Sequence, residues 1–125
     1  MAKVTGMEIK WLPEVEDQDY SAAVSYLGLL FSEDRVAQMV AKLRSAAIVQ
    51  YKAKDIFRAS TLSLLGVSNS HLQKDTKKIE KGIGLSPLLL VRDEQNGKLV
   101  IADGYHRLCA IYGFDEDAWI HCKII

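Results

Sequence analysis

Two unbroken apolar runs of strand length, joined by a polar loop, restrict the fold of this chain more than any other feature. They occupy residues 88–91 and, directly after Lys98, residues 99–101, and the loop between them contains Asn96-Gly97. Short apolar runs bounded by turn residues are typical of buried strands, and Asn-Gly is a strong signal for a turn between paired strands. We therefore predict a β-hairpin over residues 88–102.

The chain leaves this hairpin through Asp103-Gly104, which breaks the second strand, and residues 107–112 are predicted to form a short helix. A strand that turns directly into a helix points backbone N–H groups at one spot, where the helix dipole adds partial positive charge. Arg107 has the planar guanidinium that grips a phosphate through two parallel hydrogen bonds. The sequence therefore predicts a phosphate site at residues 103–107. The alternative is an ordinary Asp-Gly turn with an internal arginine–carboxylate pair.

Elsewhere, apolar residues recur with the period of strands or with the spacing of helices. Strands are predicted at residues 7–12, 48–51 and 119–125, helices at 20–31, 33–46 and 71–81, and a short helix or turn at 52–58. Asp19 and Ser32 are expected to cap the first two helices, and Gly82 to end the third. The predicted fold is α+β, with a small mixed β-sheet, packed helices and an N-terminal helical hairpin.

The length and composition indicate a single domain that does not enter a membrane. The chain has 125 residues, which we divide into an N-terminal strand and helical hairpin, residues 1–47, and a core, residues 48–125. No apolar run approaches the roughly 20 residues of a membrane span, and no apolar signal core precedes the first acidic residues. We therefore expect a cytoplasmic protein in which Cys109 and Cys122 stay reduced.

The charge balance favours a small ligand over nucleic acid. Lys and Arg total 16, as do Asp and Glu, so the formal net charge is zero, which argues against a surface that is basic throughout. Two local basic groups stand out. His71, Lys74 and Lys78 share one face of a predicted helix, and Lys52 and Lys54 lie close together in the chain. Either group can add phosphate contacts if it faces the turn, and otherwise it is solvated surface.

Residues 48–125 resemble the ParB/sulfiredoxin superfamily. The resemblance rests on a helix, Pro87 at the entry to a strand, a hairpin, the box DGYHR at residues 103–107, a helix and a closing strand. In that family the box typically cradles the phosphates of a nucleotide. The resemblance implies a ParB/sulfiredoxin-like fold and a bound ATP, ADP or CTP, with Mg²⁺ as a companion ion. Sulfiredoxins have their catalytic cysteine where this chain has Tyr105, so we do not expect reduction of cysteine sulfinic acid.

The resemblance also suggests roles for single residues. Gly104, Tyr105, His106 and Arg107 would bind the phosphate or nucleotide, and Asp103 and His106 are the candidate catalytic residues, with Asp103 as base or Mg²⁺ ligand. Asp55 and Glu80 remain alternative bases. The first hypothesis is therefore a nucleotide-binding domain, acting as a small phosphotransferase or nucleotide hydrolase. Whether a reaction occurs stays open.

Two other functions remain as alternatives. A ParB-like nucleic-acid-binding or nuclease module would use the basic residues between Lys52 and Lys81, and its affinity would fall steeply with salt. A non-catalytic interaction protein with a vestigial site, such as a homodimer, would use the helical hairpin at residues 20–46. A zinc site is not expected, because the histidines and cysteines lack the paired spacing of zinc ligands.

Overall fold

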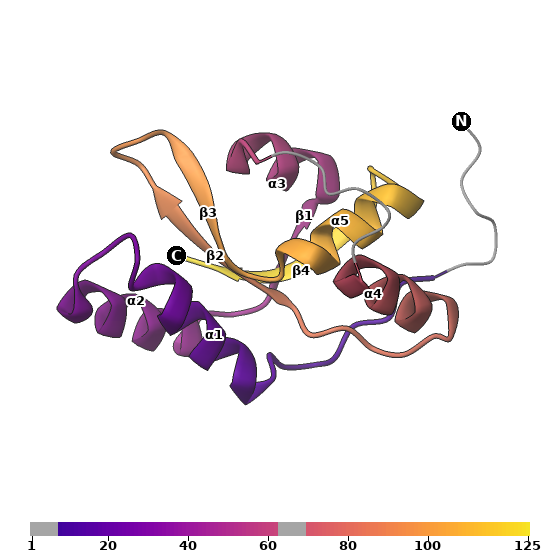
Figure 1. Cartoon of the computed structure of the whole chain (residues 1–125), viewed down its shortest axis with the longest axis horizontal. Coiled ribbons are helices and arrows are strands. Elements are labelled where there is room, and N and C mark those ends of the chain that lie inside the picture. Colours follow the sequence, from indigo (N-terminus) through magenta and orange to yellow (C-terminus); the bar gives the residue numbers. More distant parts are fainter. Residues whose placement is uncertain (1–7, 63–69) are drawn as a thin grey trace.

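The computed structural model describes residues 8–62 and 73–125 in full and residues 70–72 by their backbone alone. These residues form a mixed sheet with helices on both of its faces (Figure 1). The helices are α1 (Asp17–Leu27), α2 (Glu33–Ser45), α3 (Ala53–Ser60), α4 (Ser70–Glu80) and α5 (Tyr105–Phe114). The strands are β1 (Val49–Lys52), β2 (Leu88–Asp93), β3 (Lys98–Asp103) and β4 (Trp119–Ile124). The predicted α+β class with a small mixed sheet is confirmed.

The strand order is β1-β4-β2-β3. The pairs β1/β4 and β2/β3 are antiparallel, whereas β2 and β4 run parallel at the centre of the sheet. In Figure 1, α1 and α2 lie on one side of the sheet, and α3 and α5 lie on the other. Helix α4 packs along α5 and belongs to this second layer. Both faces of the central strands are therefore covered.

This double cover explains the unbroken apolar run in β2. Leu88 and Leu90 point into the core beneath α3, α4 and α5, and Leu89 and Val91 point into the core beneath α1 and α2. A strand buried on both faces has no polar side, so its sequence shows no alternation. The predicted hairpin is confirmed by the antiparallel pairing of β2 with β3, and Gly97 ends its loop with φ of +64°.

The helical hairpin forms with shifted bounds. Helix α2 begins as predicted after Ser32, whose hydroxyl accepts a hydrogen bond from the Arg35 N–H at 3.4 Å. Helix α1 begins at Asp17, with Glu16 at the cap position, so the prediction that Asp19 caps this helix is wrong. Asp19 lies instead within the first turn, and its side chain is buried. The consequence is that Asp19 faces the interior of the molecule.

The predicted strand at residues 7–12 is wrong for the residues that the structure describes. Over residues 8–12 there is only an isolated parallel bridge between Trp11 and Leu85, and Met7 lies outside the described residues. The Leu12 N–H donates to the Leu85 carbonyl at 2.8 Å, and the Leu85 N–H donates to the Lys10 carbonyl at 2.9 Å. The alternating pattern thus reflects a segment tied to the loop before β2, outside the sheet.

The connection from β3 to α5 is tighter than the sequence suggests. Gly104 has φ of +109°, and a Cβ built there would lie 2.6 Å from Leu88 Cγ and 2.9 Å from Arg107 Nη2. A side chain would collide with the core, so this turn requires glycine. Helix α5 starts at Tyr105, two residues earlier than predicted, and continues through Gly113 to Phe114.

Among the described residues, no helix is long and apolar enough to cross a membrane.

Candidate functional site at the start of α5

The guanidinium of Arg107 is held by two carboxylates. Its Nη2 donates to Asp103 Oδ2 at 3.0 Å and lies 3.5 Å from Asp19 Oδ2. The side chains of Arg107, Asp103 and Asp19 are 17%, 18% and 9% exposed. Asp103 ends β3, Asp19 comes from the first turn of α1, and Arg107 comes from the first turn of α5. This Asp19–Asp103–Arg107 cluster therefore ties the helical hairpin to the strand–helix turn.

The cluster carries more negative than positive charge. Two carboxylates face one guanidinium, so its formal charge with all groups ionised is one negative unit. Burial raises the pKa of Asp103, and the neighbouring Asp19 raises it further, against the lowering effect of Arg107. Protonation of Asp103 would remove the negative unit.

One buried N–H group of Arg107 lacks a hydrogen-bond acceptor among the described residues. Its Nε is buried and has no hydrogen-bond partner among the described residues. A guanidinium has five N–H donors, and a buried one without a partner costs free energy. The two carboxylates therefore contact the guanidinium of Arg107 at Nη2, and its Nε is not bound by them.

The amino end of α5 meets the cluster. Gly104 at the cap position has no side chain to accept a hydrogen bond, and the first helical bond runs from the Leu108 N–H to the Gly104 carbonyl. The exposed partial positive charge of this helix end attracts anions, including the adjacent carboxylate of Asp103. Tyr105 and His106 are the first two helical residues, with ring centroids 5.9 Å apart, and burial raises the pKa of Tyr105.

The structure does not bring the predicted basic pair to this turn. Lys54 Nζ lies 2.8 Å from Asp117 Oδ1, and Lys52 Nζ lies 4.0 Å from the same atom. The Lys54 N–H also donates to the Glu116 carbonyl, in the loop that follows α5. Both lysines therefore lie at the carboxyl end of this 10-residue helix, about 15 Å along its axis from Gly104.

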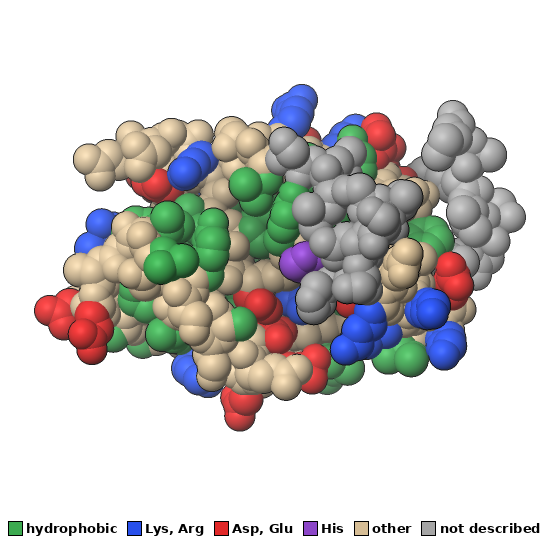
Figure 2. Space-filling view, viewed as in Figure 1, with side chains coloured by type: hydrophobic (Ala, Val, Ile, Leu, Met, Phe, Trp, Pro, Cys, Tyr) green, Lys and Arg blue, Asp and Glu red, His purple; other side chains and the backbone are tan. Residues whose placement is uncertain are grey.

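Helix α4 packs against α5 and carries the second predicted basic group. Lysine and arginine side chains gather over it in Figure 2. Lys74 is exposed and Lys78 is half-buried, and no hydrogen bond or ion pair of the described residues joins either to residues 103–107. The side chain of His71 lies outside the described residues. The structure therefore brings α4 against α5 without joining Lys74 or Lys78 to the turn by a hydrogen bond or ion pair among the described residues.

Sequence reasoning missed Asp19 as a member of this site. Asp19 and Arg107 are 88 positions apart in the chain, and an acidic residue in the first turn of a helix is ordinarily a favourable partner of the helix dipole. The available signal was helical spacing, because Asp19 precedes Ala23 and Leu27 by four and eight positions and so shares their apolar face of α1.

The described residues contain no group of three or more His, Cys, Asp or Glu side chains that could hold a metal ion. Cys109 and Cys122 are both buried free thiols. Asp103 and Asp19 supply two neighbouring carboxylates, which is the number that a magnesium site commonly takes from the protein. Mg²⁺ keeps several waters and is commonly held by one or two carboxylates together with the phosphates of a substrate.

The comparisons add no relative. No protein-family model, no curated protein and no solved structure matches this chain, so its resemblance to the ParB/sulfiredoxin superfamily stays a prediction from the residues named above.

Proposed function

We propose that this chain is a ParB/sulfiredoxin-like domain that binds a nucleotide together with Mg²⁺ at the start of α5. The phosphates would lie at the amino end of the helix, and the ion beside Asp103. One observation carries the proposal: an unbalanced pair of carboxylates adjoins a helix end that has no side-chain cap.

Charge explains why the ion matters. A bare phosphate would meet a cluster that is already negative by one unit, and repulsion would oppose the attraction of the helix end. A divalent cation reverses the sign of the cluster, and the phosphates can then approach both the ion and the α5 amides. Bound Mg²⁺ would also neutralise charge on a transferring phosphoryl group.

Each side chain of the proposed site would have its own role. Arg107 is fixed by its carboxylates, so we assign it to positioning Asp103, with its leftover Nε as a donor toward the ligand. His106, Lys74 and Lys78 would supply positive charge at the phosphates. Asp103 would hold the Mg²⁺, whose charge favours the ionised carboxylate. A small phosphotransferase or nucleotide hydrolase fits these roles.

The test is a thermal-shift and calorimetric titration with ATP, ADP and CTP, with and without Mg²⁺. A ligand at 100 times its Kd should add about 2.7 kcal/mol to the free energy of unfolding. The shift is expected for the wild type only with Mg²⁺, and it should vanish in Asp103→Asn, each protein being compared with its own ligand-free form. Asp117→Asn, which alters an ion-paired carboxylate at the other end of α5, is the matched control. Absence of any shift, or an equal shift in Asp103→Asn, would overturn the proposal.

An interaction function is the second candidate, because the end of the helical hairpin exposes several large apolar side chains. Leu29 is 82% exposed, and Val24, Tyr26 and Leu30 are each more than two-fifths exposed. Clusters of this kind often mark protein interfaces. A homodimer through this surface should appear as a concentration-dependent mass in light scattering and should be abolished by Leu29→Glu. A monomer at every concentration would exclude it.

Nucleic acid is the least supported ligand, since Lys52 and Lys54 are paired with Asp117 and lie away from the turn. Its signature would be binding that weakens steeply with added salt.

A further inference from the structure

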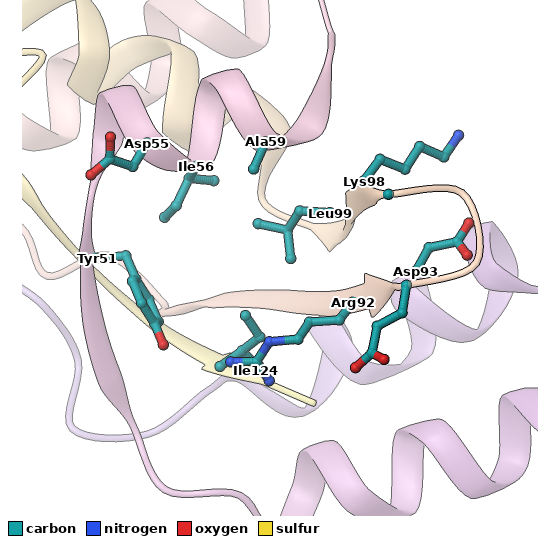
Figure 3. A pocket seen from close by; sticks show the side chains of 11 residues that line it. Tyr51, Asp55, Ile56, Ala59, Arg92, Asp93, Lys98, Leu99 and Ile124 are labelled. Atoms are coloured by element: carbon teal, nitrogen blue, oxygen red, sulfur yellow. The ribbon is translucent and has the colours of Figure 1, made fainter.

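A cavity lies between α3 and the end of the β2–β3 hairpin (Figure 3). Its volume is about 410 Å³. The apolar part of its lining comes from Ile56 on α3, Leu99 on β3 and Ile124 on β4. This size and this apolar lining are typical of sites for small organic ligands.

Arg92 gives this cavity its one unusual feature. In β2, Leu88 and Leu90 point into the core beneath α3, α4 and α5, and Arg92 is the next residue on that same face of the strand. Its cross-strand partner is Leu99. The row of core-facing residues thus ends at the rim of the sheet in an exposed arginine, which lines the cavity.

The guanidinium of Arg92 makes no hydrogen bond or ion pair with any residue in the ranges 8–62 and 73–125. In Figure 3 its side chain extends along Ile124 toward Tyr51, and the Tyr51 hydroxyl lies on the same side of the cavity. One fork-shaped donor and one hydroxyl therefore stand together at the edge of an apolar surface.

Three carboxylates also border the cavity but do not neutralise Arg92. Figure 3 shows the Asp55 carboxylate directed away from the cavity. Asp93 Oδ2 accepts a hydrogen bond from Asn96 Nδ2 at 2.8 Å within the hairpin turn, and Glu94 lies in that exposed loop. Screening by salt weakens their effect at a distance, so contacts at the guanidinium decide what binds.

We propose that this cavity binds a small amphipathic carboxylate, a molecule with an apolar body and a single carboxylate group. The body would lie on Ile56, Leu99 and Ile124. The carboxylate would accept two parallel hydrogen bonds from Arg92, and the Tyr51 hydroxyl would add a third donor. A nucleotide is a poorer match, because its polyphosphate carries several negative charges and the lining sets only two cations, Arg92 and Lys98, against three carboxylates.

Octanoate and octanol form the matched probe pair, since they share an alkyl chain and differ in charge. Binding is followed by amide chemical shifts in ¹H–¹⁵N NMR spectra during titration of the full chain. Octanoate should shift the amides of Arg92, Leu99 and Ile124, and octanol should bind at least about tenfold more weakly, as expected for loss of a charge-assisted pair.

Arg92→Gln keeps the length of the side chain and removes its charge, and it should weaken octanoate binding about tenfold or more. Arg58→Gln is the matched control, because Arg58 is an exposed arginine on α3 that does not line the cavity. Asp103→Asn should bind octanoate like the wild type, which separates this site from the one at α5. Equal affinity of octanoate and octanol, equal binding to Arg92→Gln, or shifts confined to other residues would overturn the proposal.

Discussion

The Nη2 atom of Arg107 lies 3.0 Å from Oδ2 of Asp103, so the arginine that begins α5 is held by the carboxylate that ends β3. Asp19 approaches the same nitrogen at 3.5 Å. An incoming phosphate would therefore compete with two carboxylates already in place, whereas an incoming cation would find them unbalanced. This relationship is the reason that the proposed ligand is a nucleotide with its metal ion rather than a bare anion.

Arg107→Met is expected to destabilise the fold by about 3 kcal/mol, because it leaves two mostly buried carboxylates facing each other without a cation. Urea unfolding measures the change. Lys54→Gln removes an ion pair at the surface and is expected to have a much smaller effect. Adding Asp19→Asn to Arg107→Met should restore part of the loss, and a double variant no more stable than the single one would contradict the charge account.

The Asp103 carboxyl should make stability depend on pH in a defined direction. The pKa of Asp103 in the folded protein is raised above 3.8, the ordinary value that applies to the unfolded chain. Between the unfolded and the folded pKa, the folded state binds more protons than the unfolded state. Stability from this group therefore falls as the pH rises through that window. In Asp103→Asn this contribution should be absent. The measurement is the difference in unfolding free energy between the wild type and Asp103→Asn at successive pH values from about 3.8 upward. A difference that does not change with pH would show that the pKa of Asp103 is not raised.

Three glycines should respond differently to alanine. Gly104→Ala is expected to cost about 2–5 kcal/mol, because φ is +109° and the new Cβ would lie 2.6 Å from Leu88 Cγ. Gly97→Ala has a positive φ but open space around its Cβ, so about 1 kcal/mol is expected. Gly113→Ala, within α5 and without contacts, should stabilise by about 0.5–1 kcal/mol. Denaturation midpoints of the series check this order, and a tolerated Gly104→Ala would mean that the turn can open.

The two cysteines should be inert in the folded protein. Cys122 is fully buried, and burial raises its pKa to about 12, so almost no thiolate is present at neutral pH. Cys109 is buried as well. Labelling by a thiol reagent should be slow under native conditions and complete in urea. Rapid native labelling of either cysteine would require opening of the sheet or of α5.

The sequence predicted those elements whose signals are local. The apolar run at residues 88–91, the cap at Ser32 and the end of α4 near Gly82 each depend on residues within a turn or a strand of one another, and the structure confirms all three. The alternation at residues 7–12 was misleading, because a period of two also suits an extended segment that makes a single bridge.

The candidate site was predicted in part. The box at residues 103–107 does form a strand–glycine–helix turn, as its local pattern indicates. The partners of its arginine were not predictable, since Asp19 reaches Arg107 only when α1 packs against β3. Lys52 and Lys54 were assigned to the turn by charge, and their position at the far end of α5 depends on how α3 docks.

The sequence by itself determined the hairpin, most of the helices and the α+β class, because backbone preference and apolar periodicity act between near neighbours. Only the tertiary structure decided which charges meet. The Asp19–Asp103–Arg107 cluster and the solitary Arg92 above an apolar cavity both result from packing of distant segments. The physical reason is that an ion pair forms over a few ångströms in space, and separation along the chain carries no information about that distance.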